Sequence, residues 1–293
     1  AATRKIGDTP RQATSNSARS LARTLNKYCS IPPVYEAMIP VWDQGRGQKT
    51  ERAMAFLPIH EMVGVVVPEG RESEWCSLPD AQEGFDVKMD KWATTVGVGG
   101  AELGKYAALV LWGDSAPFTN NRGDNLYLWI WSFLSGPSRR RYWICSHSKR
   151  DVCQCGCFGR CTFDAIIHVL CWMFRALLAR VYPSVDHLGR PWPLKSWRRS
   201  KANSPLRLGG ALIGKCGDWA WYKSTLGLRG WRGETTRKYC CWICKAGLAN
   251  AHDCFDVTRA ALWRSSLLTQ ALLWETAREE GVFISEIWSI PGF

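Results

Sequence analysis

Residues 105–114, which read KYAALVLWGD, decide the fold of this chain. The run from Tyr106 to Trp112 has the length and apolar character of a buried strand, and Gly113-Asp114 ends it. A second run, Asn125 to Leu134, ends at a Ser-Gly-Pro turn, and a third covers Arg141 to Ser146. Such short connections predict an antiparallel meander of three strands.

After the meander, the sequence predicts a helix and a fourth strand. Ala165 to Tyr182 reads as a helix that is apolar around most of its circumference, with Thr162 as N-cap and Pro183 after its end. Leu206 to Cys216 resembles a strand, which ends at Gly217-Asp218. Two further helices are expected, at Trp219–Leu226 and Val257–Glu280.

This order of elements predicts an α/β (α+β) fold with a ribonuclease-H-like core, in which flanking helices cover a mixed sheet and the first and fourth strands are neighbours. Residues 105–293 would form that core. Residues 31–104 mix Pro, Gly and acids and read as a small irregular lead-in region, with one strand at Glu61–Pro68. Residues 1–30 read as a mobile arm.

The composition excludes a disordered protein and favours a polyanionic partner. Of 293 residues, 46% are hydrophobic and seventeen are tryptophans. Residues 138–217 carry fifteen basic and three acidic side chains, which equals the net charge of +12 for the whole chain. Clustered Lys and Arg favour phosphate through counterion release, whereas the alternative is a solvated basic face.

Thirteen cysteines, an odd number, in a chain without an apolar leader indicate an intracellular protein from a reducing compartment, not a secreted one. The longest apolar stretches, Ala107–Trp112 and Leu126–Trp131, are far shorter than the roughly 20 residues of a membrane span, so no membrane partner is expected. The chain begins at Ala1 without an initiator methionine and ends at Phe293 after Pro-Gly, which we interpret as a fragment.

Asp114 and Asp218 follow the ends of the first and fourth strands. Acids on neighbouring strands can converge, bind Mg²⁺ or Mn²⁺ and activate water against a phosphodiester. The alternative is that each Gly-Asp is simply a turn. Such a site needs a third acid on a later helix, and the candidates there, which have no distinguishing context, are Glu275, Glu279 and Glu280.

Two groups of cysteines predict structural zinc. Cys241-x-x-Cys244, with His252 and Cys254, has the spacing of a zinc knuckle, although Cys240 could replace Cys241. Buried thiols without metal are the alternative. A denser group, made of Cys145, His147, Cys153, Cys155, Cys157 and Cys161, reads as a loop wrapped around one zinc, although an iron–sulfur cluster remains open. Its candidate ligands are Cys153, Cys155, Cys157 and Cys161.

Basic residues with interleaved aromatics predict the nucleic-acid contact. Trp143, Trp192, Trp197 and Trp231 are the aromatics that could stack on exposed bases. The stretch WPLKSWRRSK (192–201) has no periodic apolar face and is the best surface candidate. The candidate contact residues are Arg139, Arg140, Arg141, Lys195, Arg198, Arg199 and Lys201.

Several motifs together resemble transposon-derived proteins that occur in many copies in dinoflagellate genomes. The motifs are WGDSAPF (112–118), GPSRRRYWIC (136–145), RDVCQCGCFGRCTFD (150–164), GDWAW (217–221), GWRGE (230–234) and CCWICKA (240–246). The resemblance covers residues 105–293. That group is similar to cut-and-paste transposases with a ribonuclease-H-like core, which implies metal-binding acids at Asp114 and Asp218 and a zinc knuckle at Cys241 and Cys244.

The resemblance also implies an incomplete catalytic set, because related sequences continue beyond IPGF (290–293) into a segment with a further Asp and His. We therefore expect a nuclear, transposase-derived DNA-binding domain with a partial site for metal-dependent phosphodiester cleavage or strand transfer. Two alternatives stay open: a non-catalytic, zinc-stabilised nucleic-acid-binding protein, and a redox or interaction protein that uses its thiols.

Overall fold

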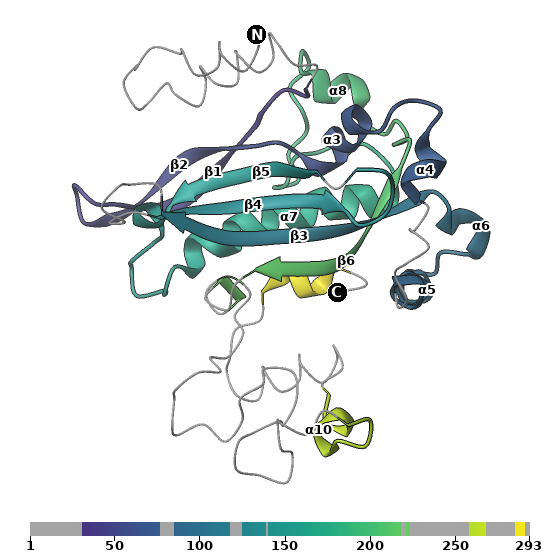
Figure 1. Ribbon diagram of the computed structural model, residues 1–293. Helices are drawn as coiled ribbons and strands as arrows, with labels where there is room; N and C mark the ends of the chain where they lie inside the picture. The colour runs from purple at the N-terminus through teal and green to yellow at the C-terminus, as the bar shows by residue number, and fades with distance from the viewer. Residues whose placement is uncertain are drawn as a thin grey trace.

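The computed structural model describes residues 31–76, 85–117, 125–138, 140–217, 221–222, 225, 258–267 and 285–290. These residues form a mixed α+β fold with a four-stranded mixed sheet, a two-stranded sheet and flanking helices (Figure 1). The strands are β1 (Tyr35–Asp43), β2 (Gln48–Phe56), β3 (Tyr106–Pro117), β4 (Asn125–Phe133), β5 (Arg141–Ser148) and β6 (Gly209–Gly217). The helices are α3 (Ile59–Val66), α4 (Glu72–Cys76), α5 (Phe85–Val96), α6 (Gly100–Leu103), α7 (Arg160–Ala179), α8 (Trp197–Lys201) and α10 (Leu262–Ser265), with 3₁₀ turns η1 (Lys149–Asp151) and η2 (Glu286–Ser289).

The four-stranded sheet has the order β5-β4-β3-β6. Strands β3, β4 and β5 form the antiparallel meander that the apolar runs predict. Strand β6 returns after α7 and pairs parallel with β3, so the first and fourth strands of this sheet are neighbours. The expected mixed sheet with flanking helices is therefore confirmed.

Strand β3 is apolar along most of its length because both of its faces are covered. Ala107, Leu109 and Leu111 face the main core. Tyr106 and Ala108 face a second, smaller core that contains Trp92 of α5. A strand in this position cannot show a polar–apolar alternation, and its continuous apolar run is the signal that located it.

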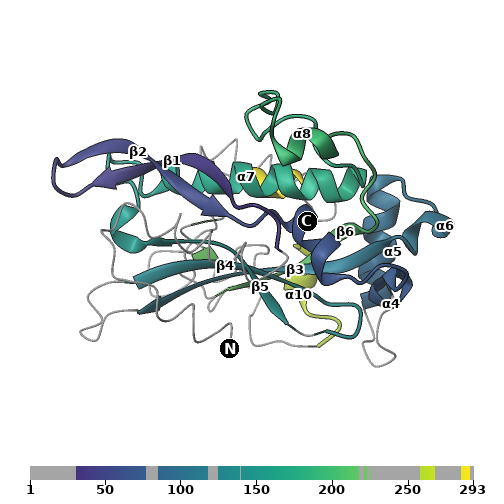
Figure 2. The same ribbon diagram turned by 90° about the horizontal axis from the view of Figure 1, so that it is seen from above.

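Helix α7 runs along one face of the sheet, with the β1–β2 hairpin beside it (Figure 2). It is the one helix of the described residues whose length and hydropathy would allow it to cross a membrane. Its apolar side chains instead pack against β1, β6 and α3 in the main core. Apolar character around most of the circumference therefore reflects burial from several sides.

The N-terminal end of α7 differs from the expectation. Its N-cap is Gly159, with φ of 86°, and Thr162 lies inside the first turn. The Thr162 hydroxyl donates to the carbonyl of Pro40 at 2.6 Å and accepts from the N–H of Cys153 at 3.0 Å. Because this hydroxyl joins two other segments, it does not cap the helix.

Residues 31–76 are more regular than the expected lead-in region. Strands β1 and β2 form a continuous antiparallel hairpin, and its inward side chains belong to the main core. The strand expected at Glu61–Pro68 is wrong, because residues 59–66 form α3. Ile59, Met62 and Val63 are buried with i, i+3, i+4 spacing, so helical packing against α7 outweighs the strand preference of the valines.

The helix expected at Val257–Glu280 is wrong in its first part. Between residues 258 and 267, only the four residues of α10 are helical, and residues 268–284 lie outside the described part. The hydroxyls of Ser265 and Ser266 donate to the carbonyls of Leu262 and Trp263. Such side-chain bonds compete with helix propagation. The helical residues 221, 222 and 225 agree with the helix expected at Trp219–Leu226.

Candidate functional site

A four-cysteine cluster lies between η1 and α7. Cys153, Cys155 and Cys157 come from the connecting loop, and Cys161 comes from the first turn of α7. Their sulfur atoms all lie within 4.8 Å of one another, and the sulfurs of Cys155 and Cys161 are 3.8 Å apart. A tetrahedral zinc with Zn–S bonds of about 2.3 Å places its sulfurs ~3.8 Å apart. The cluster is compatible with a structural zinc site.

Backbone turns make the alternating cysteines converge. Gly156, Phe158 and Gly159 all have positive φ, at 90°, 53° and 86°. At Gly159, an added Cβ would lie 2.6 Å from Val152 and 2.9 Å from Phe163, so only glycine fits. The loop is therefore shaped by local backbone geometry and by packing as well as by its thiols.

The thiols differ in acidity. Burial raises the pKa of Cys157, but the Cys161 N–H and neighbouring thiols donate to its sulfur and lower that pKa to about 6. Burial and hydrogen bonding to Cys157 raise the pKa of Cys161 to about 12. A bound divalent cation would favour the thiolate form of every cysteine that coordinates it.

Two neighbours of the dense cluster in sequence do not join it. Cys145 is fully buried in β5, opposite Trp129. His147 is 4% exposed and stacks on Tyr127, and burial lowers its pKa to about 4. Both lie within the regular strand β5, where alternating side chains pack into the core, whereas the four cluster cysteines follow the end of that strand.

The loop that carries the four cysteines, residues 152–161 (the cysteine loop), is attached to the β1–β2 hairpin. Arg52 pairs with Asp151 of η1 at 2.7 Å, and the Gln44 side chain donates to the carbonyl of Arg150 at 2.8 Å. Together with the bond from Thr162 to Pro40, these contacts join the hairpin to both ends of the loop. A change in the conformation of the loop would therefore alter its contacts with the hairpin.

Asp114 lies exposed near the end of β3, where its Oδ1 accepts from the N–H of Ser115 at 2.7 Å. The preceding residue, Gly113, is the register partner of Gly217 on β6. The Trp221 ring covers both glycines, so that an added Cβ would approach it to 1.7 Å at Gly113 and 2.6 Å at Gly217. The described pairing of β3 with β6 ends at these two glycines, whereas β3 continues to Pro117 beside β4.

Several predicted site residues lie outside the described part of the chain. They are Asp218, Glu275, Glu279, Glu280, Cys240, Cys241, Cys244, His252, Cys254, Arg139 and Trp231. Within the described ranges, the four-cysteine cluster is the one group of three or more potential metal ligands whose ligand atoms lie together.

Glu286 is a described acid that the sequence did not single out. It accepts from Arg175 and bonds with His168, both on α7, at 2.8 Å each. These hydrogen bonds hold the pKa of Glu286 below its ordinary value against the effect of burial, which raises it. Glu286 thus attaches η2 to α7, on a different element from Asp114. No spacing signal marked this contact, because 111 residues separate Arg175 from Glu286.

Most of the described basic candidates are exposed. Arg141 places its guanidinium 4.1 Å from the centre of the Trp112 ring. Arg140 is exposed beside it, and the exposed cations near α8 are Lys195, Arg199 and Lys201. None of those three forms an ion pair with a described residue.

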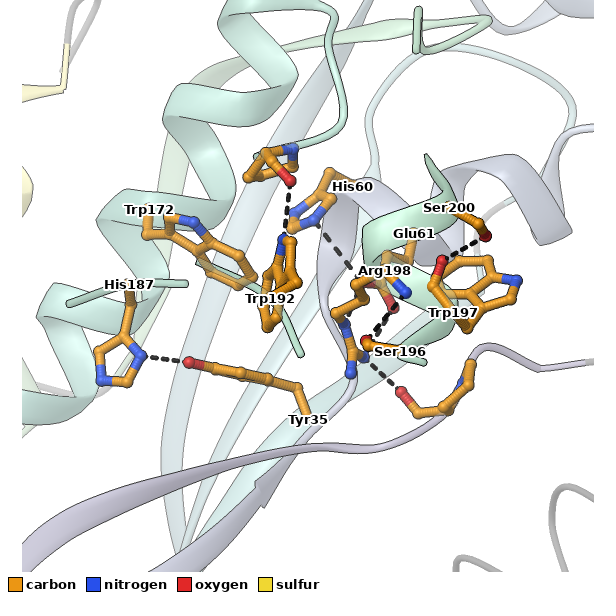
Figure 3. Close-up of polar contacts among 12 residues, drawn as sticks. Tyr35, His60, Glu61, Trp172, His187, Trp192, Ser196, Trp197, Arg198 and Ser200 are labelled. Atoms are coloured by element: carbon orange, nitrogen blue, oxygen red, sulfur yellow. Dashed lines mark hydrogen bonds and ion pairs between the residues drawn. The ribbon is translucent and has the colours of Figure 1, made fainter. Parts of the chain in front are cut away.

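Arg198 differs from the other basic candidates, because its side chain is mostly buried and points inward. Its guanidinium binds the carboxylate of Glu61 through two hydrogen bonds, at 2.6 and 2.9 Å, and also donates to the carbonyl of Pro33 (Figure 3). It also lies 5.2 Å from the centre of the Tyr35 ring. Arg198 therefore anchors α8 to the core, because its charge is needed by the buried Glu61, and it is not a nucleic-acid contact.

Trp192 and His60 lie near Arg198 and are buried with it. Trp192 is 8% exposed and donates its indole N–H to the carbonyl of Pro183, so the stacking role expected for it is wrong. His60 is 1% exposed, and burial followed by the charge of Arg198 lowers its pKa to about 3. Burial raises the pKa of Glu61, whereas the hydrogen bonds from Arg198 lower it.

No family model, curated protein or solved structure matches this chain.

The cysteine cluster gives a direct metal prediction. We expect the Cys153→Ser, Cys161→Ser double variant to hold one zinc per chain less than the wild-type protein, because two of four ligands are lost. Elemental analysis of protein purified under reducing conditions measures this difference. Cys76→Ser is the control, since Cys76 is half-buried outside the cluster. Equal zinc content in the double variant and the wild type would contradict the site.

Proposed function

We propose that this chain is a transposase-derived domain with a ribonuclease-H-like core, which binds DNA and uses Asp114 and Asp218 in metal-dependent phosphodiester cleavage or strand transfer. The observation that carries the proposal is the register of β3 and β6. In that register Gly113 lies opposite Gly217, and each glycine is followed by an aspartate in the sequence.

The geometry of parallel strands supports a shared metal site. Neighbouring strands lie about 4.8 Å apart, so if the chain continued past Gly217 in the direction of β6, the second acid would follow beside Asp114. Carboxylate oxygens are the ligands that Mg²⁺ and Mn²⁺ prefer. Asp114 supplies an exposed carboxylate at this edge. The bound cations would activate water or a hydroxyl group against the phosphodiester and stabilise the leaving oxygen.

The described surface supports a polyanionic substrate. The cations that can meet phosphate are Arg140, Arg141, Lys195, Arg199 and Lys201. A zinc bound in the cysteine loop would hold the start of α7 against the β1–β2 hairpin and would take no part in the chemistry. DNA as the substrate would place the protein in the nucleus.

A second candidate is a non-catalytic, zinc-stabilised nucleic-acid-binding domain. It is favoured by the surroundings of Asp114, because no group of three potential ligands that includes it occurs among the described residues. Glu286 cannot serve without leaving His168 and Arg175, since both of its carboxylate oxygens are engaged by them. The two candidates predict the same binding and differ in cleavage.

Asp114→Asn separates the two candidates. If the domain is catalytic, this variant should cleave DNA at least about a hundredfold more slowly in Mg²⁺ or Mn²⁺, because a metal ligand is worth several kcal/mol in the transition state. Its affinity for DNA should change by no more than about twofold, since only one exposed side chain changes. Plasmid nicking and filter binding measure the two effects.

Asp86→Asn on α5 is the matched control, because Asp86 is an exposed acid on another element, and it should leave both values unchanged. Unchanged cleavage in Asp114→Asn would remove this residue from the site. Wild-type protein that binds DNA but does not cleave it with either metal would favour the non-catalytic candidate. Absence of DNA binding would contradict both.

A further inference from the structure

The surface around α8 is cationic without compensating acids. From residue 187 to residue 207, the sequence contains no Asp or Glu. Arg198 points inward and binds Glu61. The other cations of this segment, Lys195, Arg199 and Lys201, are exposed. Among the described residues, the acid that pairs with α8 is Glu61, which Arg198 neutralises, and the three exposed cations form no ion pair there.

A cavity of about 520 Å³ lies between α3 and the segment that runs from α8 to β6. This volume is within the range of small-ligand sites. Val63, Val67 and Leu208 supply apolar lining, whereas Tyr182, Ser204 and Lys201 supply polar groups. His60 also lines it, as a neutral ring whose Nδ1 has no hydrogen-bond partner among the described residues. Glu61 and Arg207, each of which forms ion pairs, also line the cavity, so that it offers polar as well as apolar surface.

Trp197 contributes an aromatic ring to the lining of this cavity. This residue keeps 38% of its surface exposed. It meets Tyr182 edge to face, with ring centres 6.3 Å apart at 89°, so its orientation is supported by a second aromatic ring. Figure 3 shows Trp197 and the buried Trp192 on opposite sides of Arg198. Of these two tryptophans, Trp197 is the one that a ligand can reach.

We propose that this cavity binds an unpaired base of a nucleic-acid strand, with Trp197 stacked on the base and with Lys201 and Arg199 on the adjacent phosphates. The proposal rests on the proposed nucleic-acid-binding function and adds a site to it. A planar aromatic ligand with hydrogen-bonding edges and with charged groups outside the cavity matches a lining of apolar and polar side chains, an exposed indole and cations that form no ion pair with a described residue. Stacking on aromatic side chains and charge on the backbone are the two components of single-strand binding.

The test compares a short single-stranded oligonucleotide with the same strand made abasic. Trp197→Ala should weaken binding of the base-containing strand about five- to 150-fold, as expected for a lost stacking contact. It should leave binding of the abasic strand unchanged. Trp197→Phe should restore most of the affinity, because an aromatic ring remains. Fluorescence anisotropy measures the affinities, and circular dichroism checks that each variant is folded.

Lys201→Gln is the complementary variant. It should weaken binding of both strands and reduce the slope of log K against log salt by about 0.7, which is the contribution of one phosphate contact on a single strand. Lys91→Gln, an exposed position on α5 outside the proposed contacts, is the control and should leave binding of both strands unchanged.

The outcomes separate the two levels of the proposal. If the oligonucleotides bind equally with and without bases, and Trp197→Ala has no effect, the base site is wrong while nucleic-acid binding stands. If no oligonucleotide or duplex binds even at low salt, the proposed function itself fails. Binding to anionic phospholipid vesicles in place of oligonucleotides would also overturn the proposal and would assign the exposed Trp197 and Leu194 to a membrane surface.

Discussion

Arg198→Ala is expected to lower the free energy of unfolding by about 3–5 kcal/mol, because it leaves a buried carboxylate without its partner. Glu61 is 3% exposed and receives two hydrogen bonds from Arg198. The variant also loses the contacts of the guanidinium with Pro33 and Tyr35. Urea denaturation at neutral pH, followed by tryptophan fluorescence, measures the effect.

The loss should be smaller in acid. Burial already raises the pKa of Glu61 above its ordinary value of 4.5, and without Arg198 the opposing hydrogen bonds disappear, so that pKa rises further. A carboxyl with a raised pKa in the fold stabilises the protein below its unfolded pKa and loses that contribution as pH rises through the folded value. The deficit of the variant should therefore shrink between pH 7.5 and pH 5.

Arg199→Ala is the matched control for this prediction. Arg199 is the next residue on α8 and is exposed, so its replacement should change the free energy of unfolding by no more than about 0.5 kcal/mol. If Arg198→Ala proved as mild as Arg199→Ala at neutral pH, the buried ion pair would not be what anchors α8.

Gly113→Ala should destabilise the protein by about 3 kcal/mol, because the added methyl group has no space. Its Cβ would lie 1.7 Å from Cε2 of Trp221, whose ring is 1% exposed and packs edge to face on Trp129. Either the Trp221 ring must leave its position, or the paired ends of β3 and β6 must separate. Thermal unfolding and near-ultraviolet circular dichroism, which reports tryptophan packing, measure both consequences.

Gly104→Ala is the control, since Gly104 has φ of −62° and no atom within 4 Å of an added Cβ. A second test combines Gly113→Ala with Trp221→Leu. If the clash is the cause, the double variant should be less destabilised than the sum of the two single variants. Strictly additive effects would contradict the contact of Trp221 with Gly113.

The strands of the main sheet were predictable because each carries a continuous local signal. The runs that begin at Tyr106, Asn125 and Arg141 correspond to β3, β4 and β5 to within a few residues, apart from a longer end to β3. The four-cysteine loop was predictable for a similar reason, since ligands close in sequence need only a turn to converge. The acidic pair remains a prediction, because Asp218 lies outside the described residues.

Three of the errors occurred where contacts with another element decide the structure. Residues 59–66 contain enough valine for a strand, but their packing against α7 makes them helical. Arg198 belongs to a basic run that looks like surface, yet its partner Glu61 is 137 residues away. Trp192 resembles a stacking residue in the sequence, but its ring packs against Tyr35 of β1 and Trp172 of α7. In each case the deciding partner belongs to another element, which no local pattern specifies.

The connection between Arg198 and the β1–β2 region also constrains how the chain is made. Glu61 and Pro33 leave the ribosome 137 and 165 residues before Arg198 does. At about 5–20 residues per second, Glu61 is therefore without its charge partner for roughly 7–30 s. The apolar face of the hairpin is covered earlier, because β5 and α7 pack against it and are made before α8. The nascent chain should therefore be most prone to aggregation before α7 has emerged, and its buried acid is neutralised only when α8 follows.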